Sequence, residues 1–255
     1  MSISIESLTE REIAKAIDHS LLKPELDDAF VAEGCRLAAE YDVASVCVRP
    51  VDVVRAAAIL RGTDVAVGTT IGFPHGNHRT ETKVFEARQA LADGATELDM
   101  VLLIGALKSG RDADVQADIA AVVEVAHAAG ALVKVIFENA YLTDGEKVRA
   151  CHLTEAGGGD FVKTSTGFAP SGATHADLIL MRRSVSPHVQ VKAAGGIRTL
   201  DGLIEVLALG VTRVGATQTK PIIDDFRVRK AGTAGAVVGA GAGASATGVP
   251  DAGAY

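Results

Sequence analysis

Short apolar runs rich in Val, Ile and Leu recur along this chain of 255 residues, and most are followed by a longer segment with a helical pattern. Runs of this kind are typical of parallel strands that helices cover on both faces. An early helix is expected where Thr9 and Glu12 can form a capping box. The seven strands that the pattern predicts are 43–48, 65–71, one within 96–103, 132–137, 161–163, 189–193 and 211–215, and the segment 16–22 is added as an eighth, placed first.

Eight strands that alternate with helices predict a closed α/β barrel of the TIM (β/α)8 type, a single domain over residues 1–230 with an extra N-terminal helix. The competing arrangement is an open doubly wound sheet, which usually has fewer strands and often begins with a G-x-G-x-x-G turn. No such turn follows an early strand here, so the barrel is favoured. Residues 231–255 are nearly all Ala, Gly, Ser, Thr and Val, and we expect them to form a flexible tail.

Charged side chains interrupt five of the predicted strands. They are Asp18, Asp99, Lys134, Lys163 and Lys192. Burying a charge costs several kcal/mol unless it is paired, so a charge inside an apolar strand needs an explanation. Active sites of TIM barrels are built at the C-terminal ends of several strands. We therefore expect these five side chains to form an active site. The alternative is a network of ion pairs that only fills the barrel.

Two of these lysines, Lys163 and Lys192, stand on consecutive strands. A neutral lysine amine attacks a carbonyl carbon and, after loss of water, forms a Schiff base. An ordinary lysine is almost entirely protonated at pH 7, because its pKa is near 10.4. A second ammonium roughly 5 Å away, at an effective dielectric near 20, opposes that protonation by about 3 kcal/mol. One lysine can therefore be the nucleophile and the other the charge that activates it.

Asp99 and Lys134 also stand on consecutive strands. We expect them to handle protons together: the carboxylate moves a proton, and the ammonium holds it in place and donates a hydrogen bond to a substrate hydroxyl.

Glycine-rich turns follow the last two strands, at Ala194-Gly195-Gly196-Ile197-Arg198 and Gly215-Ala216-Thr217. In TIM barrels, the loops after strands seven and eight often bind phosphate with backbone N–H groups and a helix N-terminus. Tight turns between strands and helices also favour glycine, so both readings are open. Their position favours a phosphate site.

From about Leu8 to Lys220, the chain resembles the deoxyribose-phosphate aldolases. The matching stretches, in order, are I-D-H-S-L-L-K-P (17–24), A-S-V-C-V (44–48), I-G-F-P-H-G (71–76), E-L-D-M-V (97–101), G-A-L-K-S-G (105–110), K-V-I-F-E (134–138), F-V-K-T-S-T-G-F (161–168) and V-K-A-A-G-G-I-R (191–198).

The resemblance implies a class I aldolase with a TIM barrel. It would cleave 2-deoxyribose 5-phosphate to acetaldehyde and glyceraldehyde 3-phosphate, without a metal or other cofactor, as a homodimer. Carried over by motif, Lys163 forms the Schiff base, Lys192 activates it, and Asp99 is the general acid and base. The remaining residues that the resemblance implies are Lys134 and Asp18 as assistants, Gly195, Gly196, Gly215 and Thr217 at the phosphate, and Tyr255, whose position at the end of a tail suggests a role in proton transfer.

Three positions depart from the family pattern. Thr217 and Gln218 follow Gly215 where many members have serine, which leaves a hydroxyl but makes Gln218 a doubtful ligand. Phe168 stands where some members have a lysine after T-S-T-G. Arg49 replaces a frequent asparagine, and its role does not follow from the sequence.

Composition excludes several other classes of protein. A net charge of −7 argues against a nucleic-acid partner. The three cysteines, Cys35, Cys47 and Cys151, form no C-x-x-C pair, which suits a reducing cytoplasm. No secretory leader or membrane span is expected. His75 and His78 lie in a predicted loop with no third ligand in sequence, so we expect no metal.

Two alternatives stay open at this stage. One is another Schiff-base aldolase, or a transaldolase-like barrel, with a different phosphorylated substrate. The other is a catalytically silent barrel that only binds a sugar phosphate.

Overall fold

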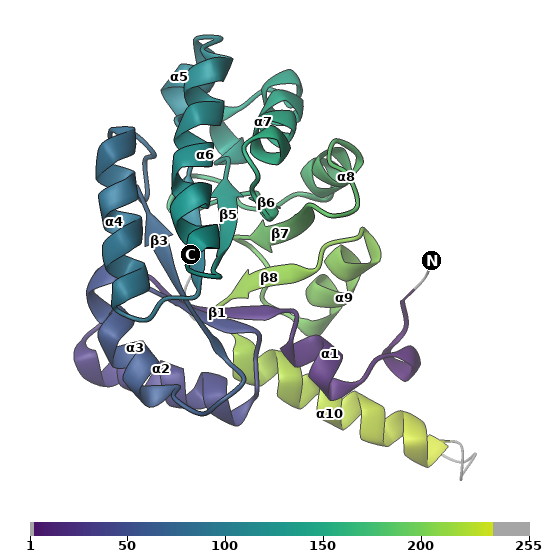
Figure 1. The fold of residues 1–255 in the computed structure, drawn as a ribbon. Helices are drawn as coiled ribbons and strands as arrows, with labels where there is room; N and C mark the ends of the chain where they lie inside the picture. Colours follow the sequence, from purple (N-terminus) through teal and green to yellow (C-terminus); the bar gives the residue numbers. More distant parts are fainter. Residues whose placement is uncertain (1–2, 237–255) are drawn as a thin grey trace.

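Eight parallel strands close into a barrel in the order β1 to β8, and β1 completes the ring by pairing with β8 (Figure 1). The computed structural model describes residues 3–236. The strands are β1 (Ile17–Leu21), β2 (Ser45–Val48), β3 (Ala66–Ile71), β4 (Glu97–Val101), β5 (Leu132–Ile136), β6 (Phe161–Lys163), β7 (Gln190–Ala194) and β8 (Arg213–Ala216).

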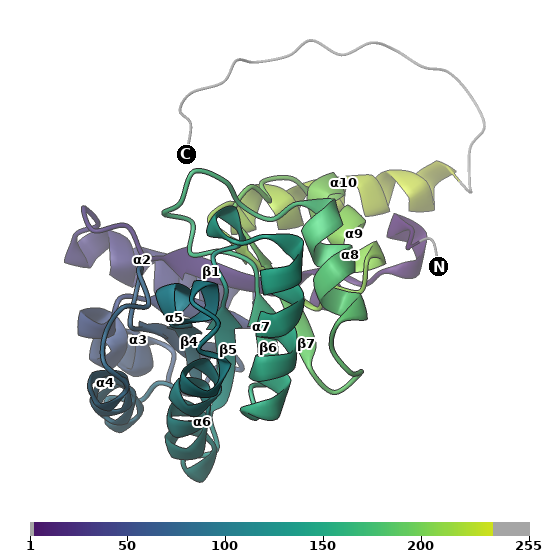
Figure 2. The same ribbon diagram turned by 90° about the horizontal axis from the view of Figure 1, so that it is seen from above.

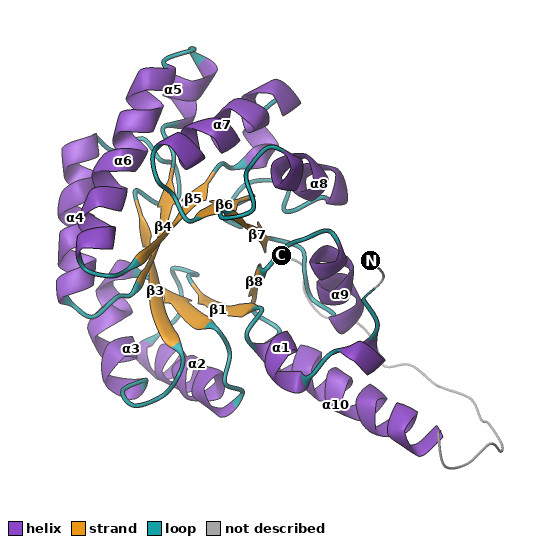
Figure 3. Cartoon of the chain, turned by 45° about the vertical axis from the view of Figure 1, so that its right-hand side comes forward, coloured by secondary structure: helices purple, strands orange, loops and turns teal. Residues whose placement is uncertain are grey.

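Helices surround the strands as an outer layer (Figure 3). They are α1 (Glu10–Ala14), α2 (Asp28–Glu40), α3 (Val53–Ile59), α4 (Thr80–Ala92), α5 (Ile104–Lys108), α6 (Asp112–Ala128), α7 (Asp144–Ala156), α8 (His175–Arg183), α9 (Leu200–Ala208) and α10 (Thr219–Ala236), with short 3-10 turns η1 (Ile5–Ser7), η2 (Pro50–Asp52) and η3 (Asn139–Tyr141). The predicted TIM barrel is therefore confirmed.

The extra N-terminal helix is α1, and it packs beside α10 (Figure 1), which runs along one outer edge of the molecule (Figure 2). It begins as the capping box predicts. The Thr9 amide donates to Glu12 Oε2 at 2.7 Å, and the Glu12 amide donates to Thr9 Oγ1 at 3.2 Å. These bonds satisfy backbone donors that the first helical turn leaves unpaired.

One expectation about element bounds was wrong, and one helix was not predicted. Helix α10 continues to Ala236, so residues 231–236, which we assigned to the tail, are helical. Alanine extends an existing helix well because it has the highest helix propensity and the nucleus is already formed. Helix α5 was missed, because five residues are too few to show a helical period. The rest of the predicted tail, 237–255, lies outside the described residues.

The core lies between the strands and the helices. Residues such as Leu98, Met100, Val133 and Val135 alternate with the charged residues along β4 and β5 and are buried. Successive side chains of a strand point to opposite faces, so the charged residues point into the barrel when these apolar ones point to the helices. The alternation of apolar and charged side chains along these strands thus places the charged groups inside the barrel.

Candidate active site

Asp99 is the centre of a cluster of charged side chains inside the barrel. Its Oδ2 atom accepts from Lys163 Nζ and from Lys192 Nζ, each at 2.7 Å, and its Oδ1 atom accepts from Lys134 Nζ at 3.0 Å. The two lysine nitrogens on Oδ2 are therefore no farther apart than twice that distance. Lys163 and Lys192 are also direct partners in the register of β6 and β7. The structure brings together the lysine pair that the sequence predicted.

Asp18 joins the cluster from β1. Its Oδ2 atom lies 2.5 Å from Lys192 Nζ and 3.4 Å from Lys134 Nζ. All five charged residues that the sequence singled out are thus within one network, and all are buried. The sequence predicted positions within strands or at their ends, and the structure has both. Only Lys163 is the last residue of its strand, whereas the other four lie within theirs.

Two members of this network were missed by sequence reasoning. Glu97 Oε2 lies 2.5 Å from Lys134 Nζ, and the Arg213 guanidinium contacts both Glu97 and Asp18. A signal existed for Glu97: it stands two residues before Asp99, so the period of two places both side chains on one face of β4. Arg213 lay within a predicted strand, but a single strand does not show which face is inward.

The charges of this network balance only if one lysine is neutral. Among the described residues it holds four basic side chains, Lys134, Lys163, Lys192 and Arg213, against three carboxylates, those of Asp18, Glu97 and Asp99. A net charge in a buried, low-dielectric site is costly. Lys163 has a single carboxylate partner, so it is the basic group that loses its proton at least cost.

The pKa shifts of the network follow this count. Burial lowers the pKa of Lys163, the charge of Lys192 lowers it further, and Asp99 opposes both. For Lys192, burial alone would lower the pKa, but Asp18 and Asp99 outweigh it and the pKa is raised. We expected the Lys192 charge to be the chief activator of Lys163. It contributes, but burial is the larger cause.

The two aspartates stay ionised. Burial works against the Asp99 carboxylate, yet Lys134, Lys163 and Lys192 together hold its pKa well below the usual range. Lys134 is itself held in the charged form: burial opposes its charge, but Asp18, Asp99 and Glu97 raise its pKa. The site therefore contains one amine poised to be neutral beside a fixed carboxylate and fixed ammonium groups.

The loop after Lys163 is tied to the end of β5. Glu138 follows β5 in the left-handed backbone conformation, with φ of 57°, and its buried carboxylate accepts from the Thr166 amide at 3.2 Å and from the Thr166 hydroxyl. Burial raises the pKa of Glu138, against the hydrogen bonds from Thr166. Neither residue was predicted to matter, because nothing in sequence marks an unusual backbone angle.

Cys47, on β2, lies beside the charged cluster. Its Sγ atom lies 4.0 Å from Asp99 Oδ2, and burial with the nearby Asp99 charge raises the pKa of the thiol to about 11. Arg49, at the end of the same strand, pairs with Asp52 at 2.7 Å and donates to the carbonyl oxygens of Lys23 and Pro24 at 3.3 and 3.0 Å. It therefore fastens the loop between β1 and α2.

Of the predicted phosphate residues, three lie on the loops after β7 and β8, and Gly215 lies within β8. Gly195 and Gly196 form the turn that leads toward α9, with φ of 81° and 94°, which suits glycine. Gly215 lies within β8 and is the register partner of Asp18, and Thr217 is exposed just before α10. Two helix N-termini thus face the same end of the barrel as these residues, an arrangement that favours an anion.

Three other expectations from the sequence concern Tyr255, a metal site and a membrane span. Tyr255 lies outside the described residues. Within residues 3–236, no three His, Cys, Asp or Glu side chains gather as a metal ion would need, and no helix combines the length and hydropathy of a membrane span.

Comparison with known proteins decides the family. The model of the DeoC/LacD family of aldolases matches residues 12–240. The chain belongs to this family. A Geobacillus sp. (strain WCH70) protein named deoxyribose-phosphate aldolase is 49% identical over 84% of this chain and 96% of its own length. A Bacillus licheniformis protein named deoxyribose-phosphate aldolase 2 is 52% identical over 83% of this chain and 94% of its own.

A solved structure of the family has the same barrel. The deoxyribose phosphate aldolase of Aeropyrum pernix, described as a tetramer, superposes with a TM-score of 0.80 at 29% identity and covers 86% of this chain and 92% of its own. The predicted family is therefore confirmed, and a barrel of another aldolase or transaldolase family is set aside.

Proposed function

We infer that this chain is a deoxyribose-phosphate aldolase that works through a Schiff base on Lys163. It cleaves 2-deoxy-D-ribose 5-phosphate reversibly to acetaldehyde and D-glyceraldehyde 3-phosphate. The activity is that of its close relatives. The observation that carries the mechanism is the buried amine of Lys163, whose pKa is lowered, 2.7 Å from the carboxylate it shares with Lys192.

The first step is addition to the sugar. The neutral Lys163 amine attacks C1 of the open-chain aldehyde, and a water molecule leaves as the protonated imine forms. The C3 hydroxyl then gives its proton to a base, the C2–C3 bond breaks, and its electron pair moves into an enamine on the lysine. C3 leaves as the aldehyde carbon of glyceraldehyde 3-phosphate.

The second half restores the enzyme. The enamine takes a proton at C2, and water hydrolyses the resulting imine to acetaldehyde and free Lys163. Asp99 is suited to accept and return protons because it contacts both Lys163 and Lys134. Lys134 is held in the charged form and can donate a hydrogen bond to the C3 oxygen. Asp18 assists by holding Lys192 and Lys134 in place.

The phosphate is proposed to rest on Gly195, Gly196, Gly215 and Thr217. Support comes from their common end of the barrel and from the N-termini of α9 and α10. If Thr217 binds the phosphate, Thr217→Val should raise KM for the phosphorylated sugar about tenfold, the usual cost of a hydrogen bond to a charged group. KM for unphosphorylated 2-deoxyribose should not change. An equal rise for both sugars would argue against this site.

The cellular location, the assembly and the partners of the protein are also proposals. Three free, buried cysteines support a reducing cytoplasmic location. We propose a homodimer as the assembly and the phosphorylated sugar as the only small-molecule partner, with no cofactor, nucleic acid or membrane. Light scattering of the purified protein would measure the number of subunits.

The deciding experiment is reduction with borohydride in the presence of acetaldehyde, followed by peptide mass analysis. We expect an ethyl group on Lys163 that is absent from Lys163→Ala. That variant keeps every surface lysine, so it also measures background alkylation. An adduct on Lys192 or Lys134 would keep the aldolase class but overturn the assignment of roles. No adduct on folded protein would overturn the Schiff-base mechanism.

A further inference from the structure

Two aromatic rings from distant parts of the chain meet at the mouth of the barrel. Phe73 follows β3 by two residues, and Phe168 follows Lys163 by five. Their ring centroids are 5.3 Å apart and the planes are nearly perpendicular, at 89°. Phe168 is nevertheless 49% exposed. The pair therefore offers an apolar surface to the solvent on the loops that follow β3 and β6.

The topology places this contact above the catalytic strands. Strands β4 and β5 stand between β3 and β6 in the barrel, so a contact from the β3 loop to the β6 loop spans the side of the barrel that contains these two strands (Figure 3). The β3 loop leans over β4, because Gly76 packs so tightly that a Cβ there would lie 2.1 Å from the Leu102 carbonyl oxygen. Asp99 and Lys134 thus belong to the two strands, β4 and β5, that lie between the loops carrying the rings.

The β6 side of the contact is anchored from below. The Thr166 hydroxyl donates to Glu138 and accepts from the Phe168 amide at 3.0 Å. The Asn139 amide donates to the Thr164 carbonyl oxygen at 3.0 Å, which joins the same two segments again. A buried glutamate in a left-handed conformation is costly and persists only where its surroundings hold it. Glu138 and Thr166 therefore fix the position of Phe168.

We propose that Phe73 and Phe168 determine acceptor specificity in the direction of synthesis: they bind the apolar chain of an unphosphorylated aldehyde, and Glu138 and Thr166 are positioning residues. The inference rests on the proposed aldolase function. A substrate attached near Lys163 can extend in two directions. One leads to the glycine turns after β7 and β8, which suit a phosphate, and the other to the rings above β4 and β5, which suit a hydrocarbon chain.

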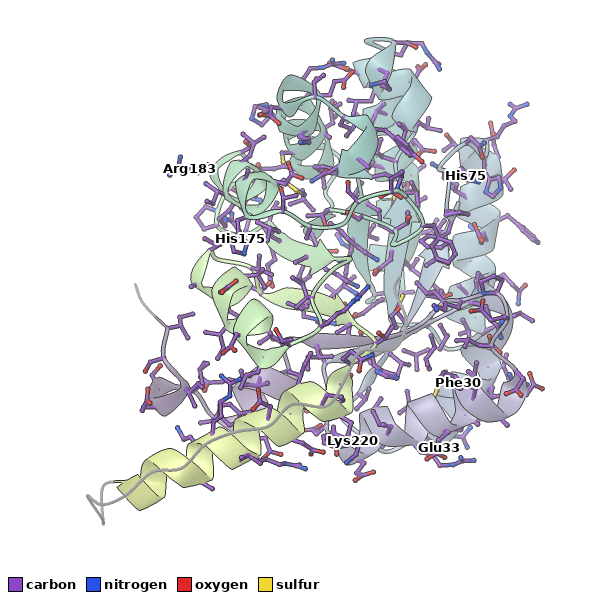
Figure 4. All side chains as sticks on the ribbon, turned by 180° about the vertical axis from the view of Figure 1, so that it is seen from behind. Phe30, Glu33, His75, His175, Arg183 and Lys220 are labelled. Atoms are coloured by element: carbon purple, nitrogen blue, oxygen red, sulfur yellow. The ribbon has the colours of Figure 1, made fainter. Side chains whose placement is uncertain are left out.

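The test compares two acceptors with acetaldehyde as the donor: glyceraldehyde 3-phosphate and hexanal. Phe168→Ala should lower kcat/KM for hexanal about tenfold, since two or so methylene groups lose their contact. In the same variant, kcat/KM for glyceraldehyde 3-phosphate should change less than twofold. Phe73→Ala should act in the same direction. Phe30 is the matched control, because it is 57% exposed on α2, away from the loop that carries His75 (Figure 4). Phe30→Ala should leave the ratio of the two acceptors unchanged.

The positioning role has its own readout. Thr166→Val removes the hydroxyl that joins Glu138 to Phe168, so it should shift the acceptor ratio as Phe168→Ala does. Thr166→Ser keeps the hydroxyl and should restore the ratio. A variant that only weakened the fold would lower kcat/KM for both acceptors by the same factor.

Several results would overturn the inference. They are an unchanged acceptor ratio in Phe168→Ala, an equal loss for both acceptors, or the same shift in Phe30→Ala. Failure of the proposed function would look different, because the wild-type protein would then neither cleave 2-deoxyribose 5-phosphate nor form the ethyl adduct. If the wild-type enzyme cleaves the sugar and forms the adduct, but the ratio of kcat/KM for the two acceptors is the same in the wild type and in Phe168→Ala, only the proposed role of the phenylalanines in specificity is contradicted.

Discussion

Replacing Lys192 by methionine should make Lys163 harder to deprotonate. The two nitrogens each lie 2.7 Å from Asp99 Oδ2, so their separation is at most twice that distance, and we take a value of about 5 Å. At an effective dielectric of 20, that separation corresponds to about 3 kcal/mol of repulsion between two ammonium groups. This energy corresponds to about a hundredfold change in the ratio of neutral to charged Lys163. The charge count agrees: without Lys192, three basic groups face three carboxylates, and the network balances with Lys163 protonated.

The assay is the pH dependence of kcat/KM for cleavage. Activity requires neutral Lys163, so it falls as the pH drops below the apparent pKa of the cluster. A raised pKa in Lys192→Met moves this acidic limb to higher pH, and activity at pH 7 should fall about a hundredfold. Lys192→Arg is the control that keeps the positive charge, and its limb should stay near that of the wild type. An unmoved limb in folded Lys192→Met would refute the reasoning and leave burial as the only cause.

Three further predictions concern other parts of the chain. Lys83→Met leaves Asp118 buried without the partner that lies 2.6 Å away, and urea unfolding should show a loss of about 3–5 kcal/mol; a loss below 1 kcal/mol would contradict a costly unpaired charge. Gly76→Ala places a Cβ against backbone at a positive φ and should cost more than about 2 kcal/mol, whereas Gly145→Ala in α7, where nothing lies within 4 Å, should be neutral or stabilising. Deleting Tyr255 should slow the exchange of acetaldehyde methyl protons measured by NMR, and unchanged exchange would exclude it from proton transfer.

The barrel could be predicted because seven strands carry their own apolar signal, and the segment of β1 was added to complete the eight. Runs of Val, Ile and Leu on strands such as β2 and β5 are unambiguous for a sheet covered on both faces. The charged residues were recognisable for the same reason, since Lys134 and Lys163 stand out within apolar strands. Their pairing then followed from the order of strands alone.

The rest depended on three-dimensional placement. The strands of a barrel are tilted and staggered, so residues of neighbouring strands meet at levels that sequence does not show. That stagger explains why Asp18 and Lys192 meet within the barrel and not at its rim. Arg213 was missed for a different reason, because a single strand does not show which of its faces points into the barrel. Glu138 could not be found because a left-handed backbone in a non-glycine residue is set by its surroundings.

The balanced charges within the barrel limit how this protein can change over evolution. Removal of one carboxylate from the charged network around Asp99 leaves an uncompensated positive charge in a buried place, so it harms the fold as well as the chemistry. Substitutions in compensating pairs, such as Glu97 with Arg213, avoid that cost. Directed evolution that randomises these positions one at a time will therefore discard most of its library to misfolding. Libraries that vary ion-paired partners together will reach new specificities through variants that still fold.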